Sequence, residues 1–398
     1  MNIKKTSYLV FGIIVFSMFL IPSALRIFKN LKPGLFANIK VQPIPTTFYS
    51  NSLNGQGLKG KLKGVLMDTR IAGNNFGTWY NDNFTLKSEL LKVFHYVKEN
   101  ILFNDPFPGK VIKGKDGWLF AGDFYDKGFS EQLGYERMKD EDIKELVQII
   151  EYYQQWCARR GIRYVFMPIQ GKAGFYHEYV PLKKSGLLTT LDLLVKQLET
   201  TQVVVVDVRK SLEKGRQKQL YLKEDTHWNG NGAWLAYNQL LDTLQCYIPE
   251  LMKLKDNEVF TDTIYPSSMD LAMLLNRTSP YPNLYVVPKI VQAKLVENKL
   301  KVPDDYTYVA KSNYEFRFEN PAANKKALIF RDSYFVHLQP LVIEAFKESV
   351  LIWSRIPDTA LIISEHPDFV IHQISERLIN DCYEEIKAKN ALKIKPDQ

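Results

Sequence analysis

A short apolar run that ends in an Asp–Ser pair constrains the fold of this chain more than any other stretch. The run, residues 327–330, has the length and composition of a buried strand, and residues 336–346 have the amphipathic pattern of a helix. A serine between such elements lies at the carboxyl edge of an α/β sheet, where these folds bind ligands. Ser333 is therefore a candidate nucleophile, with backbone N–H groups at the helix start as an oxyanion site. The alternative is that Asp332 or Ser333 only caps the helix.

A second stretch, residues 225–228 (DTHW), offers the partners that a serine nucleophile needs. Asp225 stands two residues before His227, so its carboxylate can accept a hydrogen bond from one imidazole nitrogen while the other takes a proton from a hydroxyl. Of the six histidines, only His227 has this setting. The alternative is that Asp225 or Asn229 caps the next helix and His227 is an ordinary loop residue. Together the two stretches supply nucleophile, base and orienter.

Composition and charge narrow the class of protein. The chain has 398 residues, 45% hydrophobic and 13% aromatic, which are globular values. The net charge is +8, but lysine and arginine are scattered, so we expect no nucleic-acid partner. A basic surface also suits an acidic polysaccharide or an anionic membrane face, and the alternative is ordinary solvated surface. The three cysteines imply no disulfide framework, and no His or Cys cluster has metal-ligand spacing, so no metal or cofactor is predicted.

The N-terminal part, residues 1–30, is predicted to anchor the chain in a membrane. Residues 8–25 are uncharged and mostly apolar, a run of about 18 residues that is just long enough for one span. Two lysines before it favour an N-terminus in the cytoplasm. A cleaved signal peptide and a buried soluble helix are the alternatives. Residues 31–75 are rich in proline and glycine and are predicted to be a linker.

Residues 76–390 are predicted to form a catalytic α/β domain with a mostly parallel sheet, because strands and helices alternate. An Asp-Gly pair predicts a hairpin turn within residues 111–120. Proline breaks the rhythm at about 250–325, which is predicted to be a β-rich insertion that walls the site. The remaining predicted helices are 86–97, 140–159, 187–198, 210–218, 233–244 and 373–380, and the remaining strands are 164–168, 203–208, 285–287, 308–310, 350–353 and 369–371.

Six motifs in this order resemble the SGNH-hydrolase-like domain of the alginate O-acetyltransferase family, AlgJ and AlgX. They are residues 79–82 (WYND), 114–120 (GKDGWLF), 177–181 (HEYVP), 225–228 (DTHW), 331–335 (RDSYF) and 367–371 (PDFVI). The resemblance covers about 77–378. It implies an SGNH-hydrolase-like three-layer fold with a permuted Asp–His…Ser order. It also implies that Ser333 is the nucleophile, His227 the base and Asp225 the orienter of an extracytoplasmic serine acyltransferase or esterase acting on polysaccharide.

The chain departs from the family pattern near the site. Arg331 stands where glycine is common before Asp-Ser, and residues 170–172 (QGK) replace a Pro-Asp-Lys type of loop. An arginine beside the nucleophile turn narrows the site or binds an anionic substrate. The residues expected to contact substrate are Arg331, Tyr334, Trp228 and Lys172.

The resemblance implies a single-pass protein of the inner (cytoplasmic) membrane with its catalytic domain in the periplasm. The expected activity is transfer of an acetyl group, through an acetyl-serine intermediate, to hydroxyls of a cell-surface or exported polysaccharide. A membrane-bound O-acyltransferase is the expected donor partner. One alternative is a carbohydrate acetyl esterase with the same triad. Another is a non-catalytic polysaccharide-binding assembly subunit, against which the retained Asp225, His227 and Ser333 argue.

Overall fold

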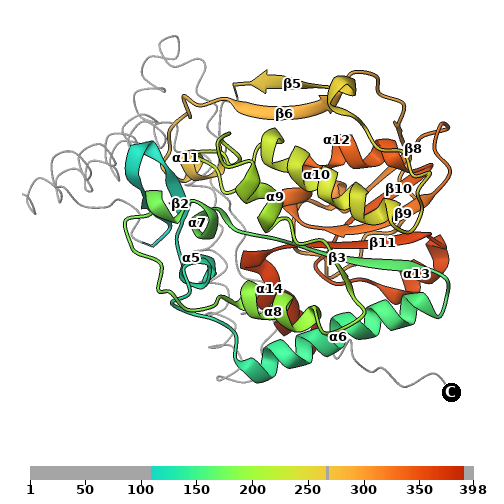
Figure 1. Cartoon of the computed structure of the whole chain (residues 1–398), viewed down its shortest axis with the longest axis horizontal. Helices are drawn as coiled ribbons and strands as arrows, with labels where there is room; N and C mark the ends of the chain where they lie inside the picture. Colours follow the sequence, from blue (N-terminus) through green and yellow to red (C-terminus); the bar gives the residue numbers. More distant parts are fainter. Residues whose placement is uncertain (1–108, 125, 266–268, 390–398) are drawn as a thin grey trace, which may run out of the picture. The chain divides into compact units, whose positions relative to one another are not determined.

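A seven-stranded sheet with the order β4-β3-β11-β9-β10-β8-β7 forms the centre of the protein (Figure 1). The computed structural model describes residues 109–389 except 125 and 266–268. The strands of this sheet are β3 (Arg163–Ile169), β4 (Val204–Val205), β7 (Lys294–Val296), β8 (Glu315–Glu319), β9 (Lys326–Arg331), β10 (Glu348–Trp353) and β11 (Phe369–Ser375). The pairs among β4, β3, β11, β9 and β10 are parallel, whereas β8 and β7 are added antiparallel. The predicted α/β class with a mostly parallel sheet is confirmed.

Helices cover both faces of this sheet, which gives three layers (Figure 1). Side chains alternate along β3: Val165 and Met167 face one core, while Tyr164 and Phe166 face the other. The first core includes side chains of α5 (Gly128–Gln132), α7 (Lys172–Phe175), α9 (Arg209–Lys214), α10 (Gly230–Gln245) and α12 (Gln339–Val342). The second includes side chains of α6 (Asp140–Ala158), α8 (Thr190–Leu198), α13 (Thr359–Glu365) and α14 (Ile379–Ala388).

Two antiparallel strand pairs lie outside the central sheet. The first pairs β1 (Val111–Lys113) with β2 (Leu119–Ala121), and its turn places Asp116 at φ 52° and Gly117 at φ 77°. The Asp-Gly prediction is thus confirmed, because these residue types tolerate positive φ. The second pairs β5 (Val259–Ile264) with β6 (Asn283–Pro288), and the short α11 (Asp270–Leu274) lies between those strands in the chain.

One predicted helix is broken. Residues 336–346 do not form a continuous helix but end a 3-10 turn (Ser333–His337) and continue as α12 and a second 3-10 turn (Ile343–Ala345). Pro340 has no N–H and cannot donate to the carbonyl four residues earlier, so it is tolerated only in the first turn of a helix, and α12 begins one residue before it. The core face of the segment is kept, since Leu341 and Val342 are buried.

Two predicted strands and one predicted helix differ from the structure. The run 203–208 pairs only as β4, although Val206 and Val208 are buried. Residues 308–310 form no strand. The predicted helix 373–380 begins later, because β11 continues to Ser375 opposite Ile169 of β3 before α14 starts. Sheet pairing to a distant strand overrides local pattern in such cases.

Part of the N-terminal prediction lies outside the described residues. This holds for the anchor at 8–25, the linker at 31–75, the helix at 86–97 and the domain start at 76. Among residues 109–389, apart from 125 and 266–268, no helix is both long enough and apolar enough to cross a bilayer.

Candidate active site

Ser333 follows the end of β9 and begins a 3-10 turn, and Asp332 fixes this turn in place. One Asp332 carboxylate oxygen accepts the Tyr334 N–H at 2.9 Å and the Gln373 amide at 2.9 Å. The other accepts the Ser375 N–H at 2.6 Å. Asp332 is therefore the cap residue, as one alternative had it. The Ser333 hydroxyl is left for a different partner.

His227 lies between Ser333 and Asp225. Its Nε2 is 2.7 Å from the Ser333 hydroxyl oxygen, and its Nδ1 is 2.6 Å from Asp225 Oδ1. The loop that carries both residues precedes α10, whose cap is Asn229: its side-chain oxygen accepts the N–H of Asn231 at 2.9 Å. Since Asn229 does the capping, Asp225 is available to orient the imidazole. The structure thus brings together the three residues that the sequence assigns to a triad.

Asp225 is held as a carboxylate. Its Oδ1 also accepts the His227 N–H at 3.0 Å, and its Oδ2 accepts the Asp270 N–H at 2.9 Å. Burial by itself would raise the pKa of Asp225, but the hydrogen bonds and charge of His227 and these amides hold that pKa well below its usual range. Burial would lower the pKa of His227, yet the Asp225 hydrogen bond and charge raise it above 6.5. Proton acceptance at Nε2 is therefore favoured.

Asp270 is a site residue that the sequence analysis missed. Its Oδ2 lies 3.9 Å from His227 Nδ1, and its Oδ1 accepts the Thr226 N–H at 2.9 Å. The Thr226 hydroxyl donates to its Oδ2. Burial and the nearby Asp225 charge raise the pKa of Asp270. No motif marks this residue, because an aspartate at a helix start is usually a cap.

The carboxylates and imidazole could in principle hold a cation. Ligand atoms of Asp225, His227 and Asp270 lie within 4.8 Å of one another, and this is the one such group in the described part of the chain. His227 Nδ1, however, already bonds to Asp225 and Nε2 to Ser333. The donor set therefore fits an orienting network for an imidazole better than a metal centre.

Lys172 holds the backbone of the loop that carries His227. It is buried, and its ammonium donates to the carbonyl oxygens of Leu222, Lys223 and Asp225 at 3.0, 3.3 and 2.6 Å. Burial lowers the pKa of Lys172 to about 7. All three donors of the amine are thus directed to the loop backbone. Nothing in this geometry supports the predicted substrate contact.

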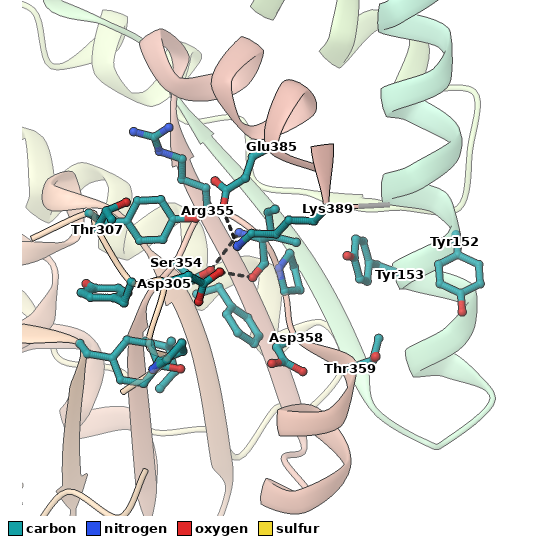
Figure 2. Close-up of a pocket in the computed structure, with 18 residues that line it drawn as sticks. Tyr152, Tyr153, Asp305, Thr307, Ser354, Arg355, Asp358, Thr359, Glu385 and Lys389 are labelled. Carbon is teal, nitrogen blue, oxygen red and sulfur yellow. Dashed lines mark hydrogen bonds and ion pairs between the residues drawn. The ribbon is translucent and has the colours of Figure 1, made fainter. Parts of the chain in front are cut away.

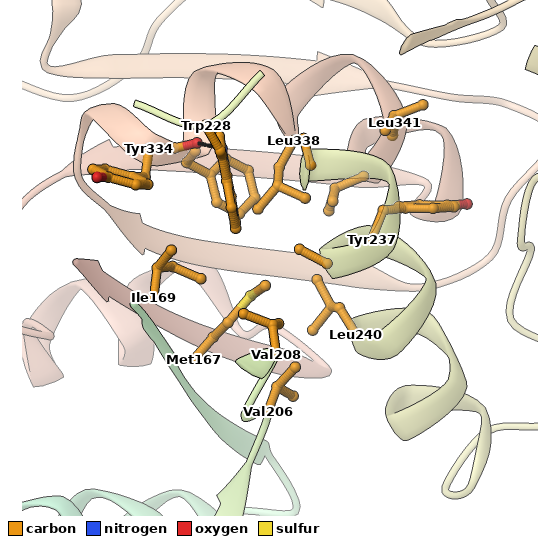
Figure 3. Close-up of a cluster of buried hydrophobic side chains, with 14 of the residues drawn as sticks. Met167, Ile169, Val206, Val208, Trp228, Tyr237, Leu240, Tyr334, Leu338 and Leu341 are labelled. Carbon is orange, nitrogen blue, oxygen red and sulfur yellow. Dashed lines mark hydrogen bonds between the residues drawn. The ribbon is translucent and has the colours of Figure 1, made fainter. Parts of the chain in front are cut away.

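Trp228 and Tyr334 join the loop to the nucleophile turn. The Trp228 indole N–H donates to the Tyr334 carbonyl at 2.9 Å (Figure 3). The Tyr334 hydroxyl donates to the Thr226 carbonyl at 2.7 Å. Both side chains are buried. Figure 3 shows them above the apolar cluster that contains Met167 and Ile169 of β3. They fix the His227-to-Ser333 distance, and their predicted contact with substrate has no support here.

Arg331 is also buried, with 1% of its surface exposed. Its guanidinium lies 4.0 Å over the Trp353 ring, and burial lowers its pKa to about 10. Two of its nitrogens, Nε and Nη1, have no hydrogen-bond partner among the described residues. The side chain is therefore part of the sheet edge beside the turn, and its predicted role in binding an anion remains a prediction.

An oxyanion donor is present at the turn itself. The Ser333 N–H is at the first helical position, where no intrahelical acceptor exists. The next N–H, of Tyr334, is used by Asp332. The half-buried Ser333 can be reached from solvent, so a carbonyl attacked by its hydroxyl can place its oxygen near this free N–H.

The strand-turn serine, the Asp-x-His loop and the mostly parallel sheet make up an α/β domain that is similar to the SGNH-hydrolase-like class. Residues 111–304 match the family described as "SGNH hydrolase-like domain, acetyltransferase AlgX". The match includes Asp225 and His227 and ends before Ser333. With the relatives below, it confirms the resemblance to the AlgJ/AlgX-type family that the sequence motifs indicate.

Similar proteins come from several bacteria. A Pseudomonas fluorescens protein named "Probable alginate O-acetylase AlgJ" is 25% identical over 174 residues, which are 42% of this chain and 41% of that protein. The protein of the same name from Pseudomonas aeruginosa is 29% identical over 175 residues, again 42% and 41%. The matches thus span about two-fifths of these relatives. The structure of Bacillus cereus PatB1 with a sulfonyl adduct superposes with a TM-score of 0.50 at 16% identity, over 69% of this chain and 99% of that one, and shows the shared fold alone.

Proposed function

We propose that this protein is a serine-dependent O-acetyltransferase that moves an acetyl group onto hydroxyls of a cell-surface or exported polysaccharide. The observation that carries the proposal is the position of His227, bonded to Ser333 on one side and to Asp225 on the other. The names of the relatives, alginate O-acetylases, support acetyl transfer as the chemistry.

The first step forms an acetyl-serine. His227 Nε2 takes the Ser333 proton as the hydroxyl oxygen bonds to the acetyl carbonyl carbon. Asp225 keeps the proton on Nδ1 and stabilises the imidazolium. The Ser333 N–H stabilises the oxyanion, a donor typically worth about 3 kcal/mol. The bond from the carbonyl carbon to the donor group then breaks, and the leaving group takes the proton from His227.

The second step transfers the acetyl group to the sugar and regenerates the Ser333 hydroxyl. A sugar hydroxyl gives its proton to His227 and attacks the acetyl-serine carbonyl, the bond to Ser333 breaks, and the serine oxygen regains its proton. Transfer exceeds hydrolysis only if the sugar is held near the acyl group and water is kept away. The substrate-binding part of the protein therefore decides between transferase and esterase.

The proposal includes a membrane setting. The apolar run at 8–25 would anchor the chain in the inner membrane, and the domain described here would then face the periplasm. A membrane-bound O-acyltransferase would bring the acetyl group to Ser333. This arrangement places the donor at the membrane and the acceptor polymer outside it.

The test uses the full chain, a chromogenic acetyl ester as donor and oligosaccharides as acceptors, beside Ser333→Ala. We expect Ser333-dependent release of the chromophore, with acetyl found on a sugar by mass spectrometry. The side chain of Ser333 bonds only to His227 among the described residues, so the variant keeps the fold and a loss of release reports chemistry. Release with acetate as the sole product from every acceptor would favour the esterase. Release that Ser333→Ala leaves intact would refute the triad.

A further inference from the structure

A cavity lies at the carboxyl ends of β9 and β10, apart from the triad. Its volume is about 760 Å³, within the range of small-molecule sites, which is about 300–1,000 Å³. Phe330 and Ile352 of the sheet line it. Residues of α6, of α14 and its C-terminal end, and of the segments 303–314 and 354–359 complete the lining (Figure 2). Neither Ser333, His227 nor Asp225 lines it.

Tyrosines dominate the lining of this cavity. Two come from α6 and three from the segment that precedes β8; they are Tyr152, Tyr153, Tyr306, Tyr308 and Tyr314. Such rings offer flat apolar faces together with hydroxyl groups. A sugar ring has the same combination, apolar C–H faces and a rim of hydroxyls, so an aromatic-lined cavity with polar groups suits a saccharide.

Four of the five charged groups that line the cavity already have partners, and Asp305 is the fifth. Arg355 donates to Asp381 at 2.9 Å, and Lys389 lies 2.8 Å from Glu385. Asp358 caps α13 through the N–H groups of Ala360 and Leu361. The lining includes three carboxylates, on Asp305, Asp358 and Glu385, and only two cations, on Arg355 and Lys389. This balance does not favour a carboxylate-bearing sugar and suits an uncharged one.

The inner wall of the cavity carries a polar atom without a partner. The Tyr306 hydroxyl is buried and has no hydrogen-bond partner among the described residues. Buried polar groups without partners are rare, so this hydroxyl indicates a place where a ligand hydroxyl is accommodated.

The cavity is close to the nucleophile along the chain. Phe330 lines it, and Ser333 is three residues further on, which corresponds to at most about 10 Å of extended strand. Phe330 and Ile352 belong to the second core, whereas Tyr334 belongs to the first. A polymer that occupies the cavity with one part and presents another part to Ser333 therefore has to pass over the carboxyl edge of the sheet.

We propose that this cavity binds an uncharged sugar segment of the acceptor polysaccharide, away from the unit that is acetylated. The inference rests on the proposed function and adds the substrate class: a polymer with neutral sugars in place of a pure polyuronate. Binding in the cavity would raise the local concentration of acceptor hydroxyls, which transfer in place of hydrolysis requires.

The test measures binding to the full chain carrying Ser333→Ala, so that no turnover occurs. The probes are neutral gluco-, galacto- and manno-oligosaccharides, their N-acetylated counterparts and an alginate oligosaccharide, titrated by calorimetry. We expect a neutral probe to bind, and Tyr152→Ala to weaken its binding about tenfold, as truncation of an aromatic contact does. Tyr152→Trp, which keeps a ring, should retain binding. Tyr247→Ala removes an exposed tyrosine that does not line the cavity and should have no effect.

The results distinguish failure of the cavity assignment from failure of the proposed function. Three results would overturn the inference. The first is that no neutral probe binds, and the second is that the alginate oligosaccharide binds more tightly than every neutral probe. The third is that Tyr152→Ala and Tyr308→Phe both leave the binding of the neutral probe unchanged. The thermal midpoint of each variant checks that it is folded. Chromophore release by the protein with Ser333 intact is measured in parallel. Neutral-probe binding without any Ser333-dependent release would overturn the proposed function and leave the cavity assignment standing.

Discussion

Asp270 stands directly behind Asp225: its backbone N–H donates to Asp225 Oδ2 over 2.9 Å. Its own carboxylate turns to the same side and ends 3.9 Å from His227 Nδ1. Two carboxylates thus face one imidazole nitrogen, and only Asp225 bonds to it. Asp270 has three effects: its backbone holds Asp225, its carboxylate accepts two hydrogen bonds from Thr226, and its charge acts on His227.

Replacement of Asp270 by asparagine removes the charge but keeps the backbone N–H and one acceptor oxygen for Thr226. We expect the pKa of His227, read from the pH profile of ester hydrolysis, to fall, since Asp270 is one of the charges that raise it. The kcat should fall less than in Asp225→Asn, which removes the bonded orienter. The exposed Asp262 on β5 provides the control, as Asp262→Asn should leave the profile in place. An unshifted profile in Asp270→Asn would show that this carboxylate has only a structural role.

The sequence predicted the triad but not Asp270, and the reason is physical. Asp225 and His227 are two residues apart, so their pairing is visible in a local pattern, and Ser333 follows a strand. Asp270 is 45 residues from Asp225 and meets it only after the chain has folded. Lys172 and Trp228, predicted to contact substrate, instead have their polar hydrogens directed to backbone carbonyl groups, and their contact with substrate stays a prediction. A motif position says that a residue is near the site, but the direction of its side chain depends on packing.

The pH dependence of activity follows from His227. A general base must be neutral, and the Asp225 hydrogen bond, although burial opposes it, raises the pKa of His227 above 6.5. We therefore expect kcat/KM to rise with pH through a midpoint above 6.5. Asp225→Asn should lower that midpoint together with the rate. A flat profile from pH 6 to 9 in the parent protein would exclude His227 as the base.

The contribution of His227 to stability should depend on pH in the sense opposite to its contribution to activity. Because the folded-state pKa of His227 is raised, its protonated form is favoured by folding. Its contribution is complete below the unfolded-state pKa and is lost as pH rises through the folded-state pKa. Urea unfolding of His227→Gln should show a smaller decrease in stability between pH 6 and pH 9 than the parent protein. An identical decrease in both would contradict the raised pKa.

A buried arginine joins the antiparallel edge of the sheet to its helix layer. Arg317 of β8 bonds to Glu315 at 3.0 Å, to Glu365 of α13 at 2.7 Å and to Glu348 of β10. Arg317→Met leaves three carboxylates without this partner and should cost about 3–5 kcal/mol in urea unfolding at pH 7. Lys325→Met, which removes a more exposed ion pair with Asp368, should cost less than about 1 kcal/mol.

The same cluster predicts acid sensitivity. The Arg317 hydrogen bond is the main cause that lowers the pKa of Glu365 to about 2. A lowered carboxyl pKa contributes stability above the unfolded value, about 4.3, and that contribution is lost as pH falls towards 2. The parent protein should therefore lose more stability between pH 6 and pH 3 than Arg317→Met does. Equal losses would show that Glu365 titrates normally in the fold.

This cluster also explains why the sequence did not indicate β8. Strand prediction relies on alternation of apolar and polar residues, with the apolar ones inside. In β8 the inward positions include Glu315 and Arg317, both buried, while Phe316 and Phe318 are only partly buried. The alternation is present, but charged residues that neutralise one another occupy the interior. By contrast, β3, β9 and the first half of β11 (369–371) are mostly apolar on both sides, and these stretches could be predicted from composition alone.

Loss of the Lys172 amine should loosen the His227 loop. Lys172→Met leaves the carbonyl groups of Leu222 and Asp225 without a donor among the described residues, whereas that of Lys223 keeps the Leu119 N–H at 2.9 Å. One buried group without its partner costs about 1–3 kcal/mol. We expect a lower thermal midpoint and a lower kcat, since the loop carries both Asp225 and His227. Lys115→Met removes one exposed bond to a carbonyl, that of Glu178, and serves as the control. If Lys172→Met instead raised KM at unchanged kcat and stability, the amine would be a substrate contact after all.

Asp332 and Ser333 are neighbours, yet their replacement should have different results. Asp332 bonds to the N–H groups of Tyr334 and Ser375 and to the Gln373 amide, so Asp332→Ala removes the cap and the tie between β9 and β11. It should lower both the thermal midpoint and kcat, the latter because Ser333 is no longer held 2.7 Å from His227. Ser333→Ala should abolish turnover by several orders of magnitude with the thermal midpoint almost unchanged. Asp332→Asn keeps the cap oxygen and should recover part of both losses. If Asp332→Ala lost activity without any loss of stability, the carboxylate would act in the chemistry itself, and the assignment of the orienting role to Asp225 would have to be given up.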